Sequence, residues 1–228
     1  MAVEKKIRNI VVGDIHGCFK TLSALLFAQL KIVKSDNIYF LGDYIDRGPS
    51  SKQVVDLILK LRKEGYKLFP IMGNHEKLLL ESTLSNKHFE SWVSNGCETT
   101  LKSFGIRHIG ELEEKYLTFF SSLPYFIELD DFFLCHGGMD FEITNPLDNP
   151  QAMPWMRNDF VDVSKIKNKR LIVGHTPKSL QFITDTLKSD KIMLDGGCVY
   201  SKRNPAMGYL CALELNSKEL SFQFNIDM

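Results

Sequence analysis

The first residues that could do chemistry are a carboxylate and an imidazole two positions apart. Asp14 and His16 follow a short β-branched run, and Gly13 and Gly17 flank them. On an extended segment, side chains two residues apart point to the same side. Alone, such a pair is more often a helix cap beside a surface or core histidine than a pair of metal ligands. The pair becomes informative only together with further sites of the same kind.

Similar residues follow other predicted strands. Residues 42–48 read GDYIDRG, residues 73–76 read GNHE, and His136 and His175 each come directly after a short apolar run. Loops at the carboxyl ends of neighbouring parallel strands meet in one crevice, so we expect these motifs to lie close together. Asp, Asn and His bind divalent ions such as Zn²⁺, Fe²⁺ and Mn²⁺, and one carboxylate can bridge two ions ~3.5–4 Å apart. The pattern therefore predicts a metal site.

The elements that must position these motifs alternate between strand and helix. Hydrophobic patterns predict strands at 7–12, 37–41 and 66–72, with helices at 18–31 and 50–64. This alternation indicates right-handed βαβ units and a largely parallel sheet, so the predicted fold class is α/β.

The rest of the chain divides into a helical part and a strand-rich part. Residues 75–123 look helical and are expected to cap the strand ends. After Pro124, short apolar runs predict a second sheet, with strands at 125–129, 132–135, 170–173, 191–194, 209–215 and 220–224. The long irregular connection at 144–154 is expected to border the site. We expect one domain spanning residues 1–228.

Composition narrows the classes of function. Apolar residues make up 44% and charged residues 25%, with no run of ~18 apolar residues, so we expect a soluble protein without a membrane partner. The polar, basic start at Met1–Arg8 is unlike a secretory signal, which makes the cytoplasm the expected compartment. The 28 basic and 28 acidic residues cancel, so no nucleic-acid partner is expected. The oligomeric state is left open, with a monomer expected.

Five cysteines form an odd set with no C-x-x-C pair, which favours reduced, buried thiols over a disulfide framework. Cys18 is a poor candidate for a phosphatase nucleophile. Cysteine-dependent phosphatases use a C-x₅-R loop, and Ala24 stands where the arginine would be. Attack on phosphate by a thiolate is therefore not expected.

In combination, the motifs resemble those of the calcineurin-like metallophosphoesterases. That family's pattern is D-x-H, G-D-x-x-D-R, G-N-H-[D/E] and two later histidines, and all five blocks occur in order between Gly13 and His175. The forms G-D-x-x-D-R-G and G-N-H-E further resemble the phosphoprotein phosphatase branch, particularly the small bacterial and phage lambda-type serine/threonine phosphatases. The resemblance implies two β-sheets packed face to face, flanked by helices, with the site at the strand ends.

The resemblance also implies two divalent metal ions, with manganese expected first and iron or zinc as alternatives. The implied ligands of one ion are Asp14, His16 and Asp43. The implied ligands of the other are Asp43, Asn74, His136 and His175. Asp43 would bridge the two ions, and a water shared between them would ionise near neutral pH instead of at a pKa of about 15.7. The implied reaction is direct attack by this bridging hydroxide, without a phosphoenzyme.

Other residues of the motifs acquire roles by the same resemblance. His75 is similar to the family's general acid, and Asp46 to the carboxylate that orients it. Arg47 and Arg157, the second within the sequence PWMR, resemble two arginines that bind the substrate phosphate, and Asn74 is assigned to the phosphate as well as to a metal. Without the motif, a salt bridge would be the simpler interpretation of Arg47.

The sequence departs from the family pattern in two places. Trp92 with Asn95-Gly96 resembles a W-x-x-N-G-G stretch, but Cys97 replaces the second glycine, and a buried aromatic residue beside an ordinary turn explains it equally well. The segment DGGCVY at 195–200 resembles T-G-C-V-Y-G-G of relatives, but Ser201–Pro205 replaces the last glycines. A longer, basic loop here could narrow the cleft or attract an anionic substrate.

The sequence therefore predicts a metal-dependent phosphoesterase, with phosphoserine or phosphothreonine in proteins as the leading substrate. A dinucleoside polyphosphate such as diadenosine tetraphosphate is the alternative, because hydrolases of that compound share all five motifs. A non-catalytic scaffold of the same fold is a third hypothesis. It is disfavoured because His75, Asp46 and every implied ligand are present. A nuclease is disfavoured by the zero net charge.

Overall fold

The computed structural model describes residues 7–228, so most of the polar start lies outside the described residues. Its first sheet has five strands in the order β3-β2-β1-β8-β9. Strands β1 (Asn9–Val12), β2 (Asn37–Phe40) and β3 (Lys67–Pro70) run parallel, with Asn9 opposite Asn37 and Asn37 opposite Lys67. This parallel pairing, with helices between successive strands, confirms the predicted βαβ units.

The last two strands, β8 (Tyr209–Glu214) and β9 (Glu219–Phe224), were predicted in the second sheet, and that prediction was wrong. They join the first sheet instead: β8 lies antiparallel to β1, with Val12 opposite Ala212, and β9 pairs with β8 as a hairpin. The local pattern of an apolar strand does not specify its partner. Here the β8–β9 hairpin covers the edge of β1 that does not pair with β2.

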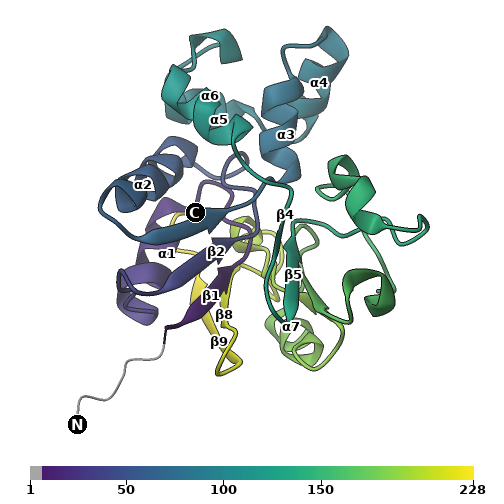
Figure 1. Ribbon diagram of the computed structural model, residues 1–228. Helices are drawn as coiled ribbons and strands as arrows, with labels where there is room; N and C mark the ends of the chain where they lie inside the picture. The colour runs from purple at the N-terminus through teal and green to yellow at the C-terminus, as the bar shows by residue number, and fades with distance from the viewer. Residues whose placement is uncertain (1–6) are drawn as a thin grey trace.

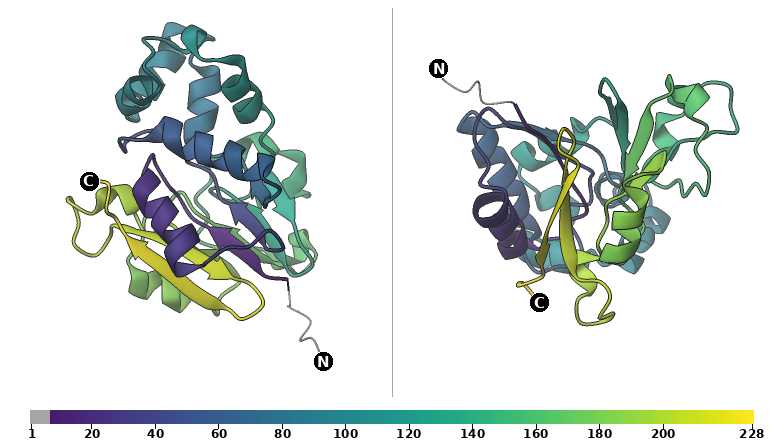
Figure 2. Two further views of the ribbon diagram at one scale, coloured as in Figure 1. Left: turned by 90° about the vertical axis from the view of Figure 1, so that its left-hand side faces the viewer. Right: turned by 90° about the horizontal axis from the view of Figure 1, so that it is seen from below.

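The second sheet has four strands in the order β4-β5-β6-β7. These are β4 (Phe126–Glu128), β5 (Phe132–Cys135), β6 (Arg170–Val173) and β7 (Lys191–Met193), and only β4 is antiparallel to its neighbour. The two sheets face each other (Figure 2), and side chains such as Val11 and Ile172 belong to one shared apolar cluster. Helix α7 (Leu180–Thr186) contributes Ile183 to that cluster. The predicted packing of two sheets is confirmed.

Helices cover the outer face of the first sheet. Helix α1 (Phe19–Ser23) continues into a π-helical stretch, η1 (Ala24–Gln29), so the predicted helix is present but its second half is wound more loosely. Helix α2 (Ser51–Lys63) buries one stripe, made of Val54, Val55, Ile58 and Leu61. This stripe packs in the same cluster as Ile10 and Ile38 of the sheet.

Four further helices form a layer beyond one end of the sheets (Figure 1). They are α3 (Asn74–Glu81), α4 (Asn86–Ser94), α5 (Glu98–Phe104) and α6 (Glu114–Ser121), which confirms the predicted helical cap. The remaining short elements are 3₁₀ turns: η2 (Ile109–Glu111), η3 (Pro146–Asp148), η4 (Pro150–Ala152), η5 (Val163–Ile166) and η6 (Cys198–Tyr200). Among residues 7–228, no helix has both the length and the apolar character needed to cross a bilayer.

Candidate active site

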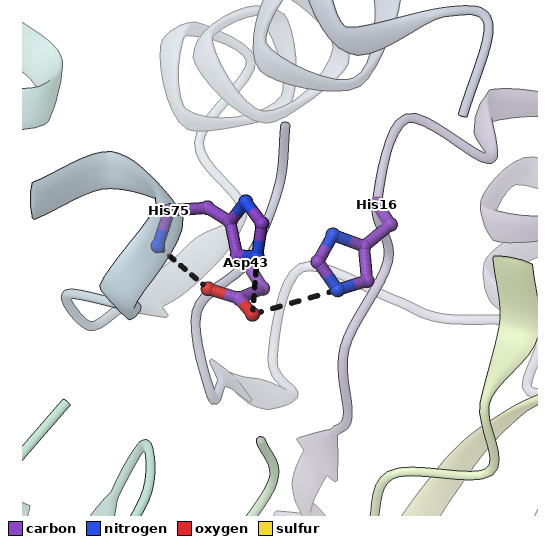
Figure 3. Close-up of side chains that lie close together, drawn as sticks. All are labelled: His16, Asp43 and His75. Atoms are coloured by element: carbon purple, nitrogen blue, oxygen red, sulfur yellow. Dashed lines mark hydrogen bonds and ion pairs between the residues drawn. The ribbon is translucent and has the colours of Figure 1, made fainter. Parts of the chain in front are cut away.

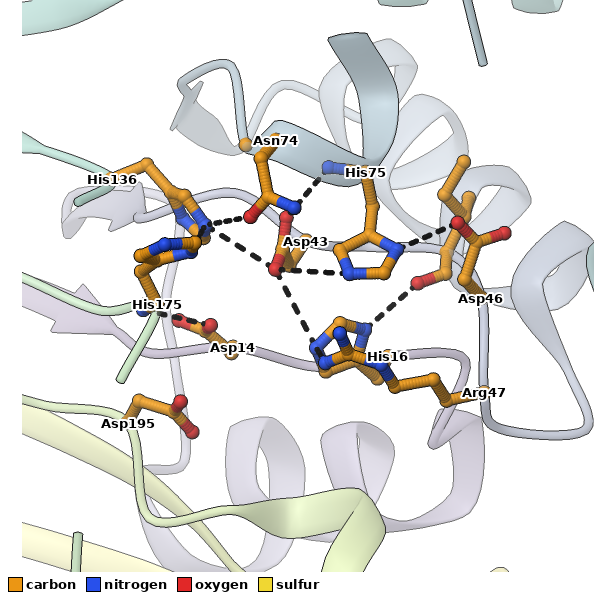
Figure 4. A network of polar contacts seen from close by, with 12 residues as sticks. Asp14, His16, Asp43, Asp46, Arg47, Asn74, His75, His136, His175 and Asp195 are labelled. Carbon is orange, nitrogen blue, oxygen red and sulfur yellow. Dashed lines mark hydrogen bonds and ion pairs between the residues drawn. The ribbon is translucent and has the colours of Figure 1, made fainter. Parts of the chain in front are cut away.

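The loops that follow β1, β2, β3, β5, β6 and β7 end at one place between the sheets (Figure 4). They bring together ten labelled side chains that the primary sequence scatters widely: Asp14, His16, Asp43, Asp46, Arg47, Asn74, His75, His136, His175 and Asp195. Nine of these were named from the sequence. The tenth, Asp195, follows β7 and was not assigned a role.

The backbone around these side chains turns unusually sharply. His16, Asp43, Asp46, Arg47 and His175 all have positive φ, between 47° and 68°. Residues with a Cβ rarely adopt this region, and such conformations cluster at functional sites. At Gly73, close packing leaves no room for a side chain, because a Cβ there would lie 2.3 Å from Oδ1 of Asp43. The turns aim functional side chains into one space.

Asp43 lies at the centre of the cluster (Figure 3). Its Oδ2 is 3.2 Å from Nε2 of His136, 3.5 Å from Nε2 of His16 and 3.9 Å from Nε2 of His75. Its Oδ1 accepts the backbone N–H of His75 at 3.1 Å. Burial disfavours ionisation, but His136 and His75 hold the pKa of this carboxyl well below its usual range. Asp43 is therefore ionised, and its negative charge lies close to the rings of three histidines.

Two histidines are oriented so that Nε2 faces the cluster. Nδ1 of His136 lies 2.7 Å from the carbonyl of Leu41, and Nδ1 of His16 lies 2.9 Å from that of Ile45. A carbonyl only accepts, so Nδ1 carries a proton in both rings, and Nε2 is the atom turned toward the cluster. Such an outer hydrogen bond is typical of metal-binding histidines.

The second imidazole group lies on the other side of Asp43. Nε2 of His136 is 2.9 Å from Oδ1 of Asn74 and 3.2 Å from Nδ1 of His175. Burial, and then the nearby His136, lower the pKa of His175 to about 3. The attraction of Asp43 and Asp14 outweighs burial at His136 and raises its pKa to about 10.

Asp14 and Asp195 add two buried carboxyl groups at the edge of the cluster. Oδ2 of Asp14 accepts the backbone N–H of His175 at 2.9 Å, and a Cβ at Gly174 would lie 2.0 Å from its Oδ1. Burial and the charge of Asp195 raise the pKa of Asp14 well above its usual range. Burial also raises the pKa of Asp195 to about 6. A cation nearby would relieve this crowding of negative groups.

The donor set fits divalent metal ions. Two groups of side chains have ligand atoms within 4.8 Å of one another: His16 with Asp43 and His75, and Asp43 with His136 and His175. Within residues 7–228, the buried side-chain nitrogen and oxygen atoms left without a hydrogen-bond partner are Oδ1 of Asp14, Nε2 of His75 and Nε2 of His175. All three belong to this site. Asp14 lies outside the first group, where the geometry places His75 instead.

Asp46 is held by a network that links the site to the helical cap. Its Oδ2 lies 2.7 Å from Nδ1 of His75 and accepts the indole N–H of Trp92 at 2.9 Å. Its Oδ1 accepts the hydroxyl of Thr100 at 2.6 Å, and all four side chains are buried. Trp92 is thus both a buried aromatic residue and a donor to the site. Sequence reasoning missed Thr100, since a threonine inside a helix carries no signal of this kind.

Arg47 contacts the cluster directly. Its Nη1 donates to Nε2 of His16 at 2.7 Å, and its guanidinium lies 5.7 Å from the ring centroid of Tyr200. The backbone N–H of Arg47 donates to the carbonyl of Gly96 at 3.2 Å. The Asn95-Gly96 turn therefore supports the arginine. Burial and Arg47 together hold the pKa of His16 well below its usual value.

Glu76, the last residue of the GNHE motif, holds the surrounding backbone in place. Its carboxylate accepts the backbone N–H groups of Gly73, Asp43 and Tyr44 at 3.1, 2.9 and 2.8 Å. It thereby ties the loop after β2 to the start of α3. Burial and the charge of Asp43 raise its pKa to about 7.

Arg157 lies outside the hydrogen-bonded cluster. Its charge contributes to the lowered pKa of His175, after burial and His136. The ring of Trp155 stands edge-on to His175, with centroids 6.5 Å apart. The loop before Arg157 does border the site as predicted, because the carbonyl of Met153 accepts the N–H groups of Gly137 and Gly138 directly after His136.

Comparison with known proteins adds an independent observation. The sequence model described as calcineurin-like phosphoesterase matches residues 7–212. A bis(5'-nucleosyl)-tetraphosphatase PrpE [asymmetrical] of Oceanobacillus iheyensis is 26% identical over 220 residues, which covers 85% of each chain.

Solved structures show the same architecture. A crystal structure of a protein provisionally described as a diadenosine tetraphosphatase superposes with a TM-score of 0.68 at 22% identity, covering 99% of this chain and 96% of that one. A serine/threonine phosphatase of Saccharomyces cerevisiae gives a TM-score of 0.62 at 14% identity, covering 100% and 82%. At these identities the likeness is one of fold.

Proposed function

The chain belongs to the calcineurin-like phosphoesterase family, and we propose that within it the protein is a hydrolase of dinucleoside polyphosphates such as diadenosine tetraphosphate. One observation carries this proposal: the similarity to a bis(5'-nucleosyl)-tetraphosphatase extends over 85% of both chains. The alternative substrate from the sequence is thus preferred to phosphoserine or phosphothreonine. The serine/threonine phosphatase structure, at 14% identity, supports the shared fold alone.

In this proposal the site holds two divalent ions, with manganese the first to test. The proposed ligands are those implied by the sequence: Asp14, His16, Asp43, Asn74, His136 and His175. When bound, the ions would activate water and neutralise the phosphoryl oxygens. The unpartnered Oδ1 of Asp14 and Nε2 of His175 support their assignment as ligands. His75 also lies near His16. Because Asp46 engages its Nδ1, we assign its Nε2 to the substrate and not to a metal ion.

His75 is the proposed general acid. Its ring is fully buried, Asp46 accepts from Nδ1, and Nε2 lies 3.9 Å from Oδ2 of Asp43 without a hydrogen-bond partner in the described chain. A proton on Nε2 would be delivered to the oxygen that departs from the attacked phosphorus. Asp46 and Trp92 hold the ring at that angle.

The two arginines suit a substrate with several phosphates. Arg47 contacts His16 at one end of the cluster, whereas the charge of Arg157 acts on His175 at the other. Figure 4 shows His16 and His175 on opposite sides of Asp43. A guanidinium donates two parallel hydrogen bonds to phosphate oxygens. In the proposal, successive phosphates of the substrate are therefore bound by Arg47, Arg157 and the amide of Asn74.

The test is a comparison of kcat/KM for diadenosine tetraphosphate and a phosphoserine peptide with manganese-loaded enzyme. We expect the dinucleotide to be preferred, with products separated by chromatography. Formation of ATP and AMP would indicate asymmetrical cleavage, and two ADP the symmetrical reaction. A higher kcat/KM for the phosphopeptide would overturn the proposed substrate. Hydrolysis of p-nitrophenyl phosphate serves as the control for active enzyme.

A further inference from the structure

A pocket of about 470 Å³ opens beside the cluster on the Arg157 side. It lies across the edge strand β7, between helix α7 and the loop at 157–161. The residues that bear on its function are Arg157, Phe160, Thr176, Lys178, Phe182 and Lys191. No role has been given to any of them except Arg157. We call this site the β7 pocket.

The β7 pocket is close to the reacting centre along the chain. Thr176 comes directly after His175 and Lys178 two residues later, and the backbone N–H of Lys178 donates to the carbonyl of Asp195 at 2.9 Å. Asn158 fixes the opposite wall, because its side chain bonds both the N–H and the carbonyl of Met139, at 2.9 and 2.8 Å. Hydrogen bonds therefore tie both walls of the pocket to the loops that follow β5 and β7.

Two exposed aromatic rings line the β7 pocket. Phe160 is 73% exposed and Phe182 is 44% exposed. Nζ of Lys178 lies 4.8 Å from the ring centroid of Phe182, so a cation and an aromatic face occur side by side. Ligand pockets are commonly lined by aromatic side chains beside a few polar groups, as here.

The charges of the β7 pocket favour an anionic ligand at its inner end. Arg157, Lys178 and Lys191 are basic, while Asp159 and Asp190 are acidic. Nζ of Lys191 donates to the carbonyl of Asn158 and is thus part of the wall. Arg157 and Lys178 remain as cations of the pocket: the charge of Arg157 acts on His175, and Nζ of Lys178 lies over the ring of Phe182. Phosphate groups and a flat ring system would be recognised together here.

We propose that the β7 pocket binds one nucleoside of the dinucleoside polyphosphate, with the base against Phe160 and Phe182 and the adjoining phosphates near Arg157 and Lys178. This inference rests on the proposed function. Nucleobases stack on aromatic side chains irrespective of sequence, since every base has a π-face. The pocket would thus select for a nucleotide without selecting strongly among the bases.

The other pockets suit this role less well. A pocket of about 500 Å³ beside Arg47 contains Tyr200, but the guanidinium of Arg47 already covers that ring. Another pocket, of about 870 Å³, lies near the amino ends of β1, β5 and β6, away from the histidines. Its Lys167 and Lys169 are paired with Glu128.

The experiment uses Phe160→Ala, because this ring is exposed and its removal leaves the core intact. We expect KM for diadenosine tetraphosphate to rise ~10-fold, as loss of base stacking predicts. Hydrolysis of p-nitrophenyl phosphate, which has no base, should be unchanged. Phe89→Ala on α4, where the ring is 37% exposed, is the matched control and should change neither. Calorimetric titration with AMP should show a similar ~10-fold weakening for Phe160→Ala.

The outcomes separate the two proposals. If the parent enzyme hydrolyses diadenosine tetraphosphate and both Phe160→Ala and Phe182→Ala keep its KM, the pocket assignment is overturned and the proposed function stands. If the parent hydrolyses only p-nitrophenyl phosphate, the proposed function fails. In that case AMP binding that weakens in Phe160→Ala would still support a nucleotide pocket, and absence of AMP binding would overturn it.

Discussion

The Asp46 side and the Arg157 side of the cluster differ in how firmly they are built. Asp46 is fully buried and bonded to His75, Trp92 and Thr100, which belong to the helical cap. On the other side, the loop after Arg157 carries Phe160 at 73% exposure. A preorganised, dry environment suits chemistry, while an open one suits recognition. The comparison leads us to expect changes on the Asp46 side to lower kcat and changes on the Arg157 side to raise KM.

The largest effect is expected where the two sides meet, at Asp43. Chelation with EDTA should abolish activity, and Mn²⁺ should restore it. Asp43→Asn removes the charge common to both candidate ligand groups, so activity should fall at least ~10⁴-fold, beyond the range expected for loss of a general acid alone. Metal content measured by plasma emission should be well below two ions per chain. Unchanged occupancy would show that Asp43 does not bridge, and full turnover by chelated protein would refute metal dependence.

On the Asp46 side, His75→Asn should lower kcat by ~10²–10⁴ for phosphoserine peptides or alkyl phosphates. The loss should be smaller for aryl phosphates and for dinucleoside polyphosphates, because their leaving groups need less protonation. The plot of log rate against leaving-group pKa should steepen. Metal content should stay near that of the parent. An equal loss for every substrate, with the metals retained, would assign His75 to electrostatics or water positioning instead.

Trp92→Phe tests whether the helical cap positions His75, the proposed general acid. The change keeps an aromatic ring but removes the donor to Asp46, so we expect kcat to fall about 10-fold, in line with a hydrogen bond to a charged group. KM should change little. The same steepening of the leaving-group plot should appear in weaker form, and Thr100→Val should behave similarly. A lower melting temperature with an unaltered leaving-group slope would mean that Trp92 is structural only.

The smallest effect is expected on the open side. Arg157→Ala should weaken competitive inhibition by inorganic phosphate by roughly 3- to 10-fold, because a solvent-accessible arginine contributes modestly. Metal content and kcat should be retained. The inhibition constant from initial rates measures the effect directly. If phosphate inhibits the variant as well as the parent, the comparison of the two sides fails at this residue.

The sequence predicted the parts of the site that are local in the chain. Each of the first three motifs follows its own strand, and parallel pairing of β1, β2 and β3 is enough to bring Asp14, Asp43 and Asn74 together. The predicted strands and helices differ from the observed ones mainly at their ends. Local hydrophobic pattern and glycine turns carry this information.

What the sequence did not predict depends on long-range partners. Thr100 lies 54 residues from Asp46, and nothing in its helix marks it as a donor. Strands β8 and β9 read as ordinary apolar runs, so their addition to the first sheet was assigned wrongly. The β7 pocket combines loop, strand and helix residues that only packing brings together. Such features arise from tertiary contacts, which no local pattern encodes.

The positive φ angles of the site have a consequence for how this chain could change over generations. Glycine tolerates such angles far better than other residues, and among the five strained positions Arg47 is the least enclosed by its neighbours. A population selected for heat resistance alone would therefore tend to accept glycine at Arg47, and in the proposed mechanism it would lose a phosphate contact by doing so. Retention of arginine at that turn would be a mark of continuing selection for hydrolysis over durability.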